Sequence, residues 1–329
     1  MKRYQQLFAS ALIFLPLLFS CYSEIDMENF RGEPKLVLNS AISPDTIVMA
    51  SVSRTLFFTD TGRFEIIADA KVELSVNGVF AEQLQWDAAA GLYKSTCSPK
   101  SGDRIKLAVT TKYGTVWAED VIPSEVKIEH IDISSREIFD QTGWIPDGNG
   151  NMTEVGKTEV KYQITFQDDA TTANYYLIRI ENANPANMVG NLDYSLDPVF
   201  IEQESIINSI FAGKTINGQG GRAFSDKIIN GQLYTSVITE TQSTDMYNNP
   251  YLPSLQRIVS LYSISESYYH YLLSLQRASD ANEMINLSSY GLAEPIRIYS
   301  NINGGTGIMA VSRRFSMPVD LSPLFPNHE

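Results

Sequence analysis

The sequence predicts a mainly β protein in which a small antiparallel β-sandwich is followed by a second β-rich domain with one amphipathic helix. Apolar and polar residues alternate with period two from about residue 36, which is the pattern of half-buried strands. Turn residues interrupt that pattern at short intervals, as in sandwiches and barrels, and helical periodicity occurs only near residues 264–277. The chain of 329 residues exceeds the usual size of one domain and therefore favours two.

Residues 1–20 have the features of a lipoprotein signal peptide. Lys2 and Arg3 precede an apolar stretch over 7–19, which is shorter than the about 20 residues that a membrane-spanning helix needs. Ser20 and Cys21 close that stretch in a way that resembles the bacterial lipobox, in which the cysteine thiol is diacylated and the leader is removed. We expect Cys21 to be the lipid-attachment site. Because each buried methylene contributes about 0.8 kcal/mol, two or three acyl chains would hold the protein on a membrane.

Residues 21–35 form a polar segment that we interpret as a flexible tether. Three acidic residues, Glu24, Asp26 and Glu28, follow the cysteine, and their placement resembles the surface-export signal of Bacteroidetes lipoproteins. Ordinary solvation of a tether explains the same residues. On the first interpretation the protein is lipid-anchored in the outer membrane and exposed at the cell surface.

Residues 36–123 are expected to form the N-terminal β-sandwich domain. Its clearest strand carries Ile105, Leu107 and Val109 in alternation with polar or small residues, so that one face is buried and the other is wet. Residues 77–78, 101–103 and 113–114 have the composition of hairpin turns. The expected strands are residues 36–39, 46–53, 71–76, 92–96, 104–111 and 115–119.

Residues 124–322 are expected to form the C-terminal β-rich domain. The segment 143–151 is so polar and rich in glycine that we predict a loop there. Ser263 and Glu266 have the spacing of a capping box, which predicts a helix that continues to about Arg277. The expected strands are residues 126–133, 160–166, 174–181, 232–239, 257–263, 296–300 and 307–312.

The net charge argues against two classes of binding partner, and the cysteine content argues against a disulfide. The formal net charge of -13, with no basic run longer than Arg313 and Arg314, argues against binding to nucleic acid. An anionic membrane surface would repel so acidic a body, so contact with the bilayer is expected only through the lipid. If Cys21 carries that lipid, Cys97 has no disulfide partner, and we interpret it as a small apolar residue in a strand.

Few residues could carry catalysis, and we expect no enzyme. The three histidines, His130, His270 and His328, belong to no catalytic or zinc motif. Asp168 and Asp169 follow a strand, where aspartate usually caps a turn. We therefore predict no catalytic residue, no metal and no cofactor.

Two loops resemble ligand-binding motifs incompletely. Residues 147–151 place oxygen-bearing side chains at alternate positions, but Met152 and Thr158 stand where a calcium loop requires glycine and glutamate. We therefore favour a hairpin loop over a calcium site. The glycines at 304, 305 and 307 lack the lysine and hydroxyl residue of a phosphate loop, so they are expected to permit positive φ or close packing of the last strands.

The aromatic residues offer one candidate ligand site. Among the three tryptophans, Trp117 lies within an apolar strand and is expected to be buried or half-buried, as most of the 17 tyrosines should be. Trp144 lies in the polar loop at 143–151 and is the best candidate for an exposed ring. We therefore select Trp144 as a possible ligand-binding residue, with a glycan as the ligand.

Several segments resemble a Bacteroidetes lipoprotein family known as domain-of-unknown-function family 4249. The most specific is Ser-Asn-Ile-Asn-Gly-Gly-Thr-Gly at 300–307, and the resemblance covers nearly the whole mature chain. It implies an envelope lipoprotein associated with TonB-dependent outer-membrane transporters, and it assigns no reaction and no catalytic residue. The first domain also resembles the immunoglobulin-like sandwiches related to carboxypeptidase regulatory domains. The other segments that carry the resemblance are residues 52–55, 70–74, 91–93, 166–169, 174–176 and 260–275.

Three functions follow from these observations as hypotheses. The first is a non-catalytic envelope lipoprotein that assists an outer-membrane TonB-dependent transport system or binds another envelope protein. The second is a carbohydrate-binding surface lipoprotein that uses Trp144 or a tyrosine platform. The third, a hydrolase with an unfamiliar carboxylate pair, would need two acids that face each other in a cleft.

Overall fold

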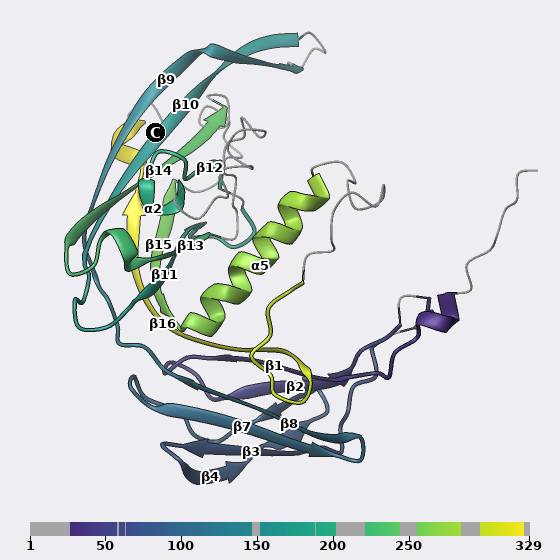
Figure 1. The fold of residues 1–329 in the computed structure, drawn as a ribbon. Helices are drawn as coiled ribbons and strands as arrows, with labels where there is room; N and C mark the ends of the chain where they lie inside the picture. Colours follow the sequence, from purple (N-terminus) through teal and green to yellow (C-terminus); the bar gives the residue numbers. More distant parts are fainter. Residues whose placement is uncertain are drawn as a thin grey trace, which may run out of the picture.

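A computed structural model describes residues 27–57, 59–62, 64–146, 152–187, 189–201, 221–243, 255–283 and 297–325. The expected signal peptide, Cys21 and the first part of the expected tether lie outside these residues. The protein is mainly β, as predicted, and the strands of the described residues form one eight-stranded sheet and two four-stranded sheets (Figure 1). Within the described part of the chain, no helix is both long enough and apolar enough to cross a membrane.

The N-terminal strands form a sandwich of two antiparallel layers. The alternating residues of β7, Ile105, Leu107 and Val109, are fully buried between the layers, as predicted. One layer is the sheet β4-β3-β7-β8, and the other is part of the eight-stranded sheet. The strands are β1 (Leu36–Ile42), β2 (Met49–Arg54), β3 (Lys71–Val76), β4 (Val79–Gln83), β5 (Gln85–Asp87), β6 (Leu92–Lys94), β7 (Arg104–Thr111) and β8 (Gly114–Val121).

The remaining strands build a second core with its own four-stranded layer, β12-β14-β10-β9. This layer packs against the other end of the eight-stranded sheet, and aromatic side chains such as Phe166, Tyr176 and Phe224 fill the space between. The short helix α2 (Pro198–Ile201) adds Phe200 to the same cluster. The strands are β9 (Ile128–Pro146), β10 (Met152–Gln167), β11 (Tyr175–Asn182), β12 (Asn191–Asp193), β13 (Arg222–Ser225), β14 (Leu233–Ser243) and β15 (Gln256–Ile264).

The last strand, β16 (Thr306–Asp320), joins the two cores. Residues 306–311 pair in parallel with β1, and residues 312–320 pair antiparallel with β15. Met309 and Val311 therefore belong to the first core, whereas Val319 belongs to the second. The first half of β16 and Ile302 thus complete the N-terminal sandwich, an arrangement that the expected boundary near residue 123 does not include.

Helix α5 (Glu266–Glu283) covers the second face of β11, β13 and β15 (Figure 1). Leu177 points to this helix, whereas its neighbours Tyr176 and Ile178 point into the second core. The helix was expected near 264–277, and its capping residue was expected to be Ser263. Instead Ser263 lies in β15, and Ser265 caps the helix by accepting a hydrogen bond from the Tyr268 backbone N–H at 3.3 Å.

Several boundaries differ from the sequence-based prediction for identifiable reasons. The loop expected at 143–151 is shorter, because β9 continues to Pro146 and β10 begins at Met152. Residues 297–300 form no strand, because they run beside α5 instead of along a sheet edge. Strand β4 was not predicted: it is an edge strand with both faces largely exposed, so its residues do not alternate.

Candidate functional site

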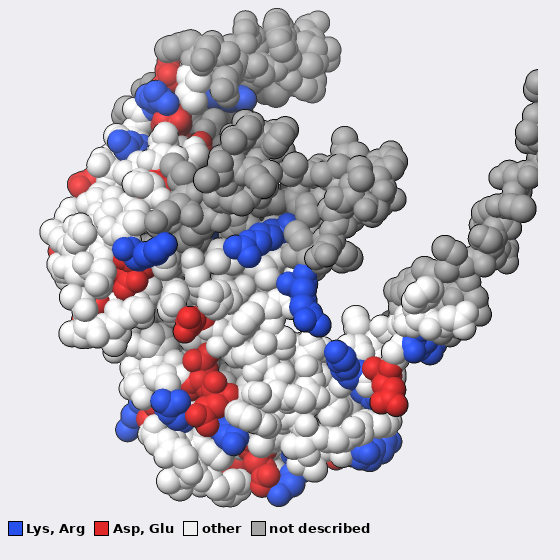
Figure 2. Space-filling view, in the orientation of Figure 1, with Lys and Arg blue, Asp and Glu red and all other residues white. Residues whose placement is uncertain are grey.

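A pocket of about 1020 Å³ lies between α5, the segment 297–306 and the ends of β1 and β2. This volume is at the upper end of the range for small-molecule sites. Figure 2 shows Lys and Arg side chains in a row along the inner edge of the crescent-shaped molecule. We call this pocket the α5 groove. It is lined by Lys35, Thr55, Tyr269, His270, Leu273, Ser274, Arg277, Arg297, Ile298, Tyr299, Ser300, Ile302, Gly305 and Thr306.

The helix supplies one wall of the groove. Tyr269, Leu273 and Arg277 are spaced at i, i+4 and i+8, so they lie on one helical face. The start of this helix is fixed to the sheet, because the backbone N–H of Ser265 donates to the carbonyl oxygen of Val311 at 3.0 Å. The helical wall is therefore held at its N-terminal end by β16.

The second wall is the segment 297–306, and hydrogen bonds fix it on both sides. The Tyr299 backbone N–H donates to Ser274 Oγ at 2.9 Å, which ties the segment to α5. Asn301 donates from Nδ2 to the carbonyl oxygen of Met309 and accepts from the Met309 N–H, both at 2.9 Å. Ile302 then enters the first core. The segment is therefore a fixed part of the groove although it has no regular secondary structure.

The third wall comes from the N-terminal sandwich. Lys35 and Thr55 continue the pairing of β1 with β2: the Lys35 N–H donates to Thr55 Oγ1 and the Thr55 N–H donates to the Lys35 carbonyl oxygen, both at 2.9 Å. Gly305 packs against this wall so closely that a Cβ there would lie 2.5 Å from the carbonyl oxygen of Leu36. The prediction that these glycines serve close packing is therefore confirmed, and Gly307 also has the expected positive φ.

The groove is cationic although the protein is acidic. Lys35, Arg277 and Arg297 come from the three different walls, and all three are exposed. Within the described residues, none of them forms an ion pair with a carboxylate, and no Asp or Glu lines the groove. On the helix, Glu266 Oε1 lies 3.6 Å from Nε2 of His270, which lines the groove. The site therefore favours a ligand with negative charge.

Aromatic rings continue from the protein interior into the groove. Tyr175 and Tyr269 have ring centroids 4.8 Å apart, followed by Tyr269 and His270 at 5.4 Å and His270 and Tyr299 at 5.6 Å. Burial and then the charge of Glu266 raise the pKa of Tyr175 to about 12, so the inner ring stays neutral. Tyr299 is 36% exposed and the His270 side chain 45%. These two rings can therefore contact a ligand.

The sequence-predicted ligand residue is not among the described lining residues of the groove. Trp144 is paired with Glu154 in the β9–β10 ladder, and its side chain is outside the described part of the structure. Trp117 was expected to be buried or half-buried, and it is partly buried: the residue is 40% exposed on the outer face of β8, with Lys106 Nζ 4.6 Å from its ring centroid. Cys21 lies outside the described residues.

The other titratable candidates have local structural surroundings. Asp169 accepts a hydrogen bond from the Thr171 N–H two residues ahead, so the predicted turn cap is confirmed for Asp169. Asp168 instead makes long-range contacts: it accepts from the Gly231 N–H at 2.7 Å and from the Tyr176 hydroxyl at 2.5 Å. Burial and then Glu82 raise the pKa of the Cys97 thiol, which disfavours the reactive thiolate.

The remaining metal and histidine candidates give no second site. In the described ranges, no group of three His, Cys, Asp or Glu residues could hold a metal ion. His130 is exposed on β9, with its Nε2 3.6 Å from Asp132. The candidate calcium loop at 147–151 and His328 fall outside the described residues.

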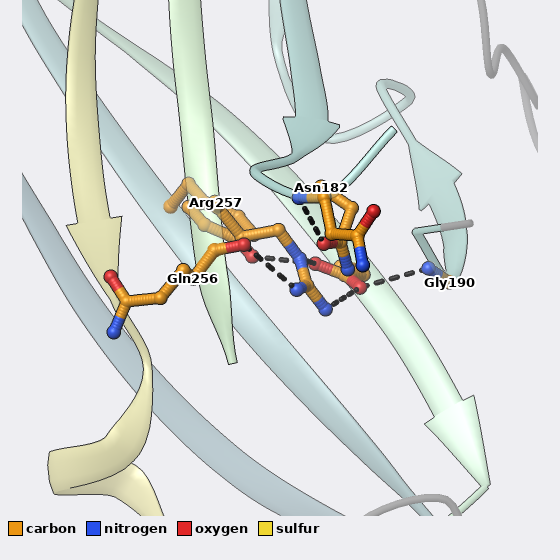
Figure 3. A network of polar contacts seen from close by, with 7 residues as sticks. Asn182, Gly190, Gln256 and Arg257 are labelled. Atoms are coloured by element: carbon orange, nitrogen blue, oxygen red, sulfur yellow. Dashed lines mark hydrogen bonds and ion pairs between the residues drawn. The ribbon is translucent and has the colours of Figure 1, made fainter. Parts of the chain in front are cut away.

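A second polar cluster lies in the C-terminal core, but it is closed to solvent. Arg257 is 1% exposed, and it donates from Nε and Nη2 to Glu240, which is fully buried (Figure 3). Glu240 also accepts from the Tyr162 hydroxyl at 2.5 Å and the Gly190 N–H at 2.8 Å. Burial opposes ionisation of Glu240, but the Arg257 guanidinium, together with the hydrogen bonds from Tyr162 and Gly190, lowers the pKa of the carboxyl below its usual value. This cluster therefore connects β10, β14 and β15 and is not a ligand site.

The sequence indicated parts of the groove without indicating the groove itself. The 300–307 motif was noted because it carries the family resemblance, and the tyrosine-rich segment was predicted to be an amphipathic helix. Neither was predicted to line a ligand site. The three cations lie at positions 35, 277 and 297, and no periodicity or spacing links residues so far apart. Only the return of β16 to β1 brings them together.

Comparison with known proteins gives one family and one distant structure. The sequence model of a family described as "Domain of unknown function (DUF4249)" matches residues 23–316. Among curated proteins, none matches the chain. A crystal structure described as a putative membrane anchored protein from Corynebacterium diphtheriae is similar at 11% identity and a TM-score of 0.21, over 70% of this chain. The aligned part spans 54% of that structure's chain, so this protein covers about half of its length.

Proposed function

The chain belongs to the DUF4249 family, and from this premise we propose that it is a non-catalytic binding protein of the cell envelope. It is anchored by lipid at Cys21 in the outer membrane and faces the cell surface. There it holds a small ligand in the α5 groove and passes it to, or receives it from, a TonB-dependent outer-membrane transporter. Its partners are the membrane, through the lipid, and that transporter.

The observation that carries this proposal is the composition of the α5 groove. It combines three cations without described acidic partners and two exposed rings, which are groups that bind a ligand. The described lining contains no carboxylate and no cysteine. It does hold His270 and Ser274. The Ser274 hydroxyl, however, donates to the carbonyl oxygen of Tyr271 and accepts from the Tyr299 N–H, so it is engaged with backbone groups and not with a base. The groove is therefore better suited to binding than to reaction.

The position of Lys35 supports a location near the membrane. The tether ends at Lys35, which itself lines the groove, only 14 residues after Cys21. A fully extended segment of that length reaches about 50 Å. A ligand in the groove would therefore stay within about 50 Å of the lipid, where an outer-membrane transporter could reach it.

The envelope assignment is tested by fractionation and purification of the full chain. We expect the wild-type protein in the outer-membrane fraction, with a transporter that co-purifies in mild detergent. Cys21→Ala should move the protein to a soluble fraction. A wild-type chain that is soluble, or that co-purifies with no envelope protein, would contradict the proposal.

The binding assignment is tested on the same purified chain. Native mass spectrometry after exposure to a small-molecule extract should detect a bound species on the wild type and on Trp144→Ala, but not on Tyr299→Ala. This pair of variants distinguishes binding in the α5 groove from binding at Trp144, the residue that the sequence suggested. A species lost only in Trp144→Ala would place the ligand on β9 instead.

Carbohydrate binding is the second candidate function, and a specific observation favours it. Tyr299 and His270 are partly exposed in the groove, and their ring centroids lie 5.6 Å apart. The apolar face of a sugar ring stacks on such surfaces. On this hypothesis the envelope location is unchanged and the transported ligand is a glycan.

A further inference from the structure

We propose that the α5 groove binds an acidic saccharide, a sugar whose ring stacks beside Tyr299 and whose carboxylate or phosphate contacts Arg277, Arg297 and Lys35. This inference rests on the proposed binding function and names the chemical class of its ligand. The juxtaposition that carries it is one exposed aromatic surface flanked by cations from three separate walls.

The ring surface is fixed in place. The Tyr299 backbone N–H is bound to Ser274 Oγ, and Ser274 in turn donates to the carbonyl oxygen of Tyr271 at 2.7 Å. His270 lies between Tyr269 and Tyr299, so that a buried ring supports an exposed one. Because these groups are already held before a ligand arrives, little side-chain freedom is lost on binding.

The three exposed cations favour an anionic group on the ligand. Arg277 and Arg297 carry guanidinium groups, whose planar donors match carboxylate and phosphate oxygens in pairs. Lys35 adds a third positive charge from the sandwich side of the groove. Since none of the three is neutralised by a described carboxylate, an anionic ligand gains attraction without displacing an ion pair of the described residues.

The remaining lining disfavours a purely apolar ligand. Its apolar side chains are Leu273, Ile298 and Ile302, and hydroxyl residues and cations alternate with them. A long acyl chain would place these polar groups against hydrocarbon, which costs free energy wherever they lose water. A sugar ring brings its own hydroxyl groups, so the lining stays hydrated or hydrogen-bonded.

Titration calorimetry of the full detergent-purified chain tests this inference with three pairs of probes. The pairs are trigalacturonate and its methyl ester, sialyllactose and lactose, and glucose 6-phosphate and glucose. In at least one pair, we expect the acid to bind about tenfold or more tightly than its neutral counterpart, as one charge-assisted contact would give. That preference should weaken as salt rises from about 50 mM to about 500 mM, because the cations are exposed.

Variants assign the preference to the groove. Arg297→Gln and Arg277→Gln should each weaken binding of the acid about tenfold and leave the neutral counterpart unchanged, whereas Tyr299→Ala should weaken both. Lys100→Gln changes the net charge equally on an exposed loop outside the groove and serves as the matched control. Inorganic phosphate alone should bind more weakly than glucose 6-phosphate, since it lacks the ring.

The outcomes separate this inference from the proposed function. Equal binding of acid and neutral sugar, both sensitive to Tyr299→Ala, would overturn the acidic class while the groove remains a binding site. If inorganic phosphate binds as tightly as glucose 6-phosphate, the sugar ring contributes nothing to affinity, and the proposed stacking beside Tyr299 is wrong. If no probe binds but native mass spectrometry detects another groove ligand, the saccharide class is wrong; if neither method detects a ligand, both proposals fail.

Discussion

Gly307 lies opposite Leu38 in the parallel pairing of β16 with β1, so close that a Cβ on Gly307 would be 2.2 Å from the Leu38 carbonyl oxygen. Its φ of +112° adds a second reason for glycine at this position. Gly307 directly follows the groove residues 305 and 306, so the same close approach closes the sandwich and positions a wall of the groove.

Replacing Gly307 by alanine should therefore destabilise the protein strongly. Gly114 is the matched control, because it has a similar φ of +129° but open space where a Cβ would be. We expect Gly114→Ala to lower the free energy of unfolding by about 1–3 kcal/mol from backbone strain alone. Gly307→Ala should lower the free energy of unfolding by about 1–3 kcal/mol more than Gly114→Ala does, because its added Cβ would overlap the carbonyl oxygen of Leu38. Urea unfolding measures both, and equal losses would show that the two strands are not so close.

The N-terminal sandwich should not fold without β16. A fragment of residues 21–123 lacks Ile302, Met309 and Val311 from its core and leaves the edge of β1 unpaired. We expect this fragment to give a poorly dispersed NMR spectrum and no cooperative unfolding. Addition of a peptide of residues 300–312 should restore dispersion. A fragment that unfolds cooperatively without the peptide would contradict the shared-strand architecture.

The buried pair of Glu240 and Arg257 should be costly to break singly. Glu240→Gln leaves the guanidinium without its counter-charge in a site that is fully buried, so we expect a loss of about 3–5 kcal/mol in the free energy of unfolding. Arg104→Gln at the exposed pair with Glu119 should cost less than about 1 kcal/mol. Similar losses at the two positions in thermal or urea unfolding would argue against burial of the first pair.

Asp120 should make stability depend on pH in the opposite sense to Glu240. Burial raises the pKa of Asp120 above its usual value, and its Oδ2 has no hydrogen-bond partner among the described residues. The folded state therefore binds the proton more tightly, and stability is lost as pH rises from about 3.8 through the raised pKa. We expect Asp120→Asn to be more stable than the wild type at neutral pH and to lose that advantage below pH 3.8. An advantage that is independent of pH would rule out titration of Asp120 as its cause.

Much of the fold could be predicted because local alternation reports burial of one strand face. Strand β7 is the clear case: its predicted bounds and its buried residues agree with the structure. Strand β11 has Tyr176 and Leu177 buried on opposite faces, because the second core covers one face and α5 the other. A strand that is buried on both faces appears in the sequence as a continuous apolar run. Such a run predicts a strand, but it does not predict which element packs on each face.

The groove could not be predicted because it depends on one long-range pairing. The parallel register of β16 on β1 brings Arg297 and Tyr299 to the sandwich that carries Lys35. Parallel strands joined through such a long connection leave no local signal of their register. The glycines at 304–307 did indicate a close approach, but only the structure shows that Leu36 and Leu38 are the residues approached.

Histidine NMR provides the most direct test of the groove as an anion-binding site, because the chain has only three histidines. His270 lines the groove, whereas His130 is exposed on β9 and serves as an internal control. With the full chain labelled at histidine, trigalacturonate or sialyllactose should shift the ring signals of His270 and leave those of His130 unchanged, and the neutral counterparts should shift His270 less. Unchanged His270 signals at acid concentrations where calorimetry detects binding, or equal shifts of His130, would contradict the account.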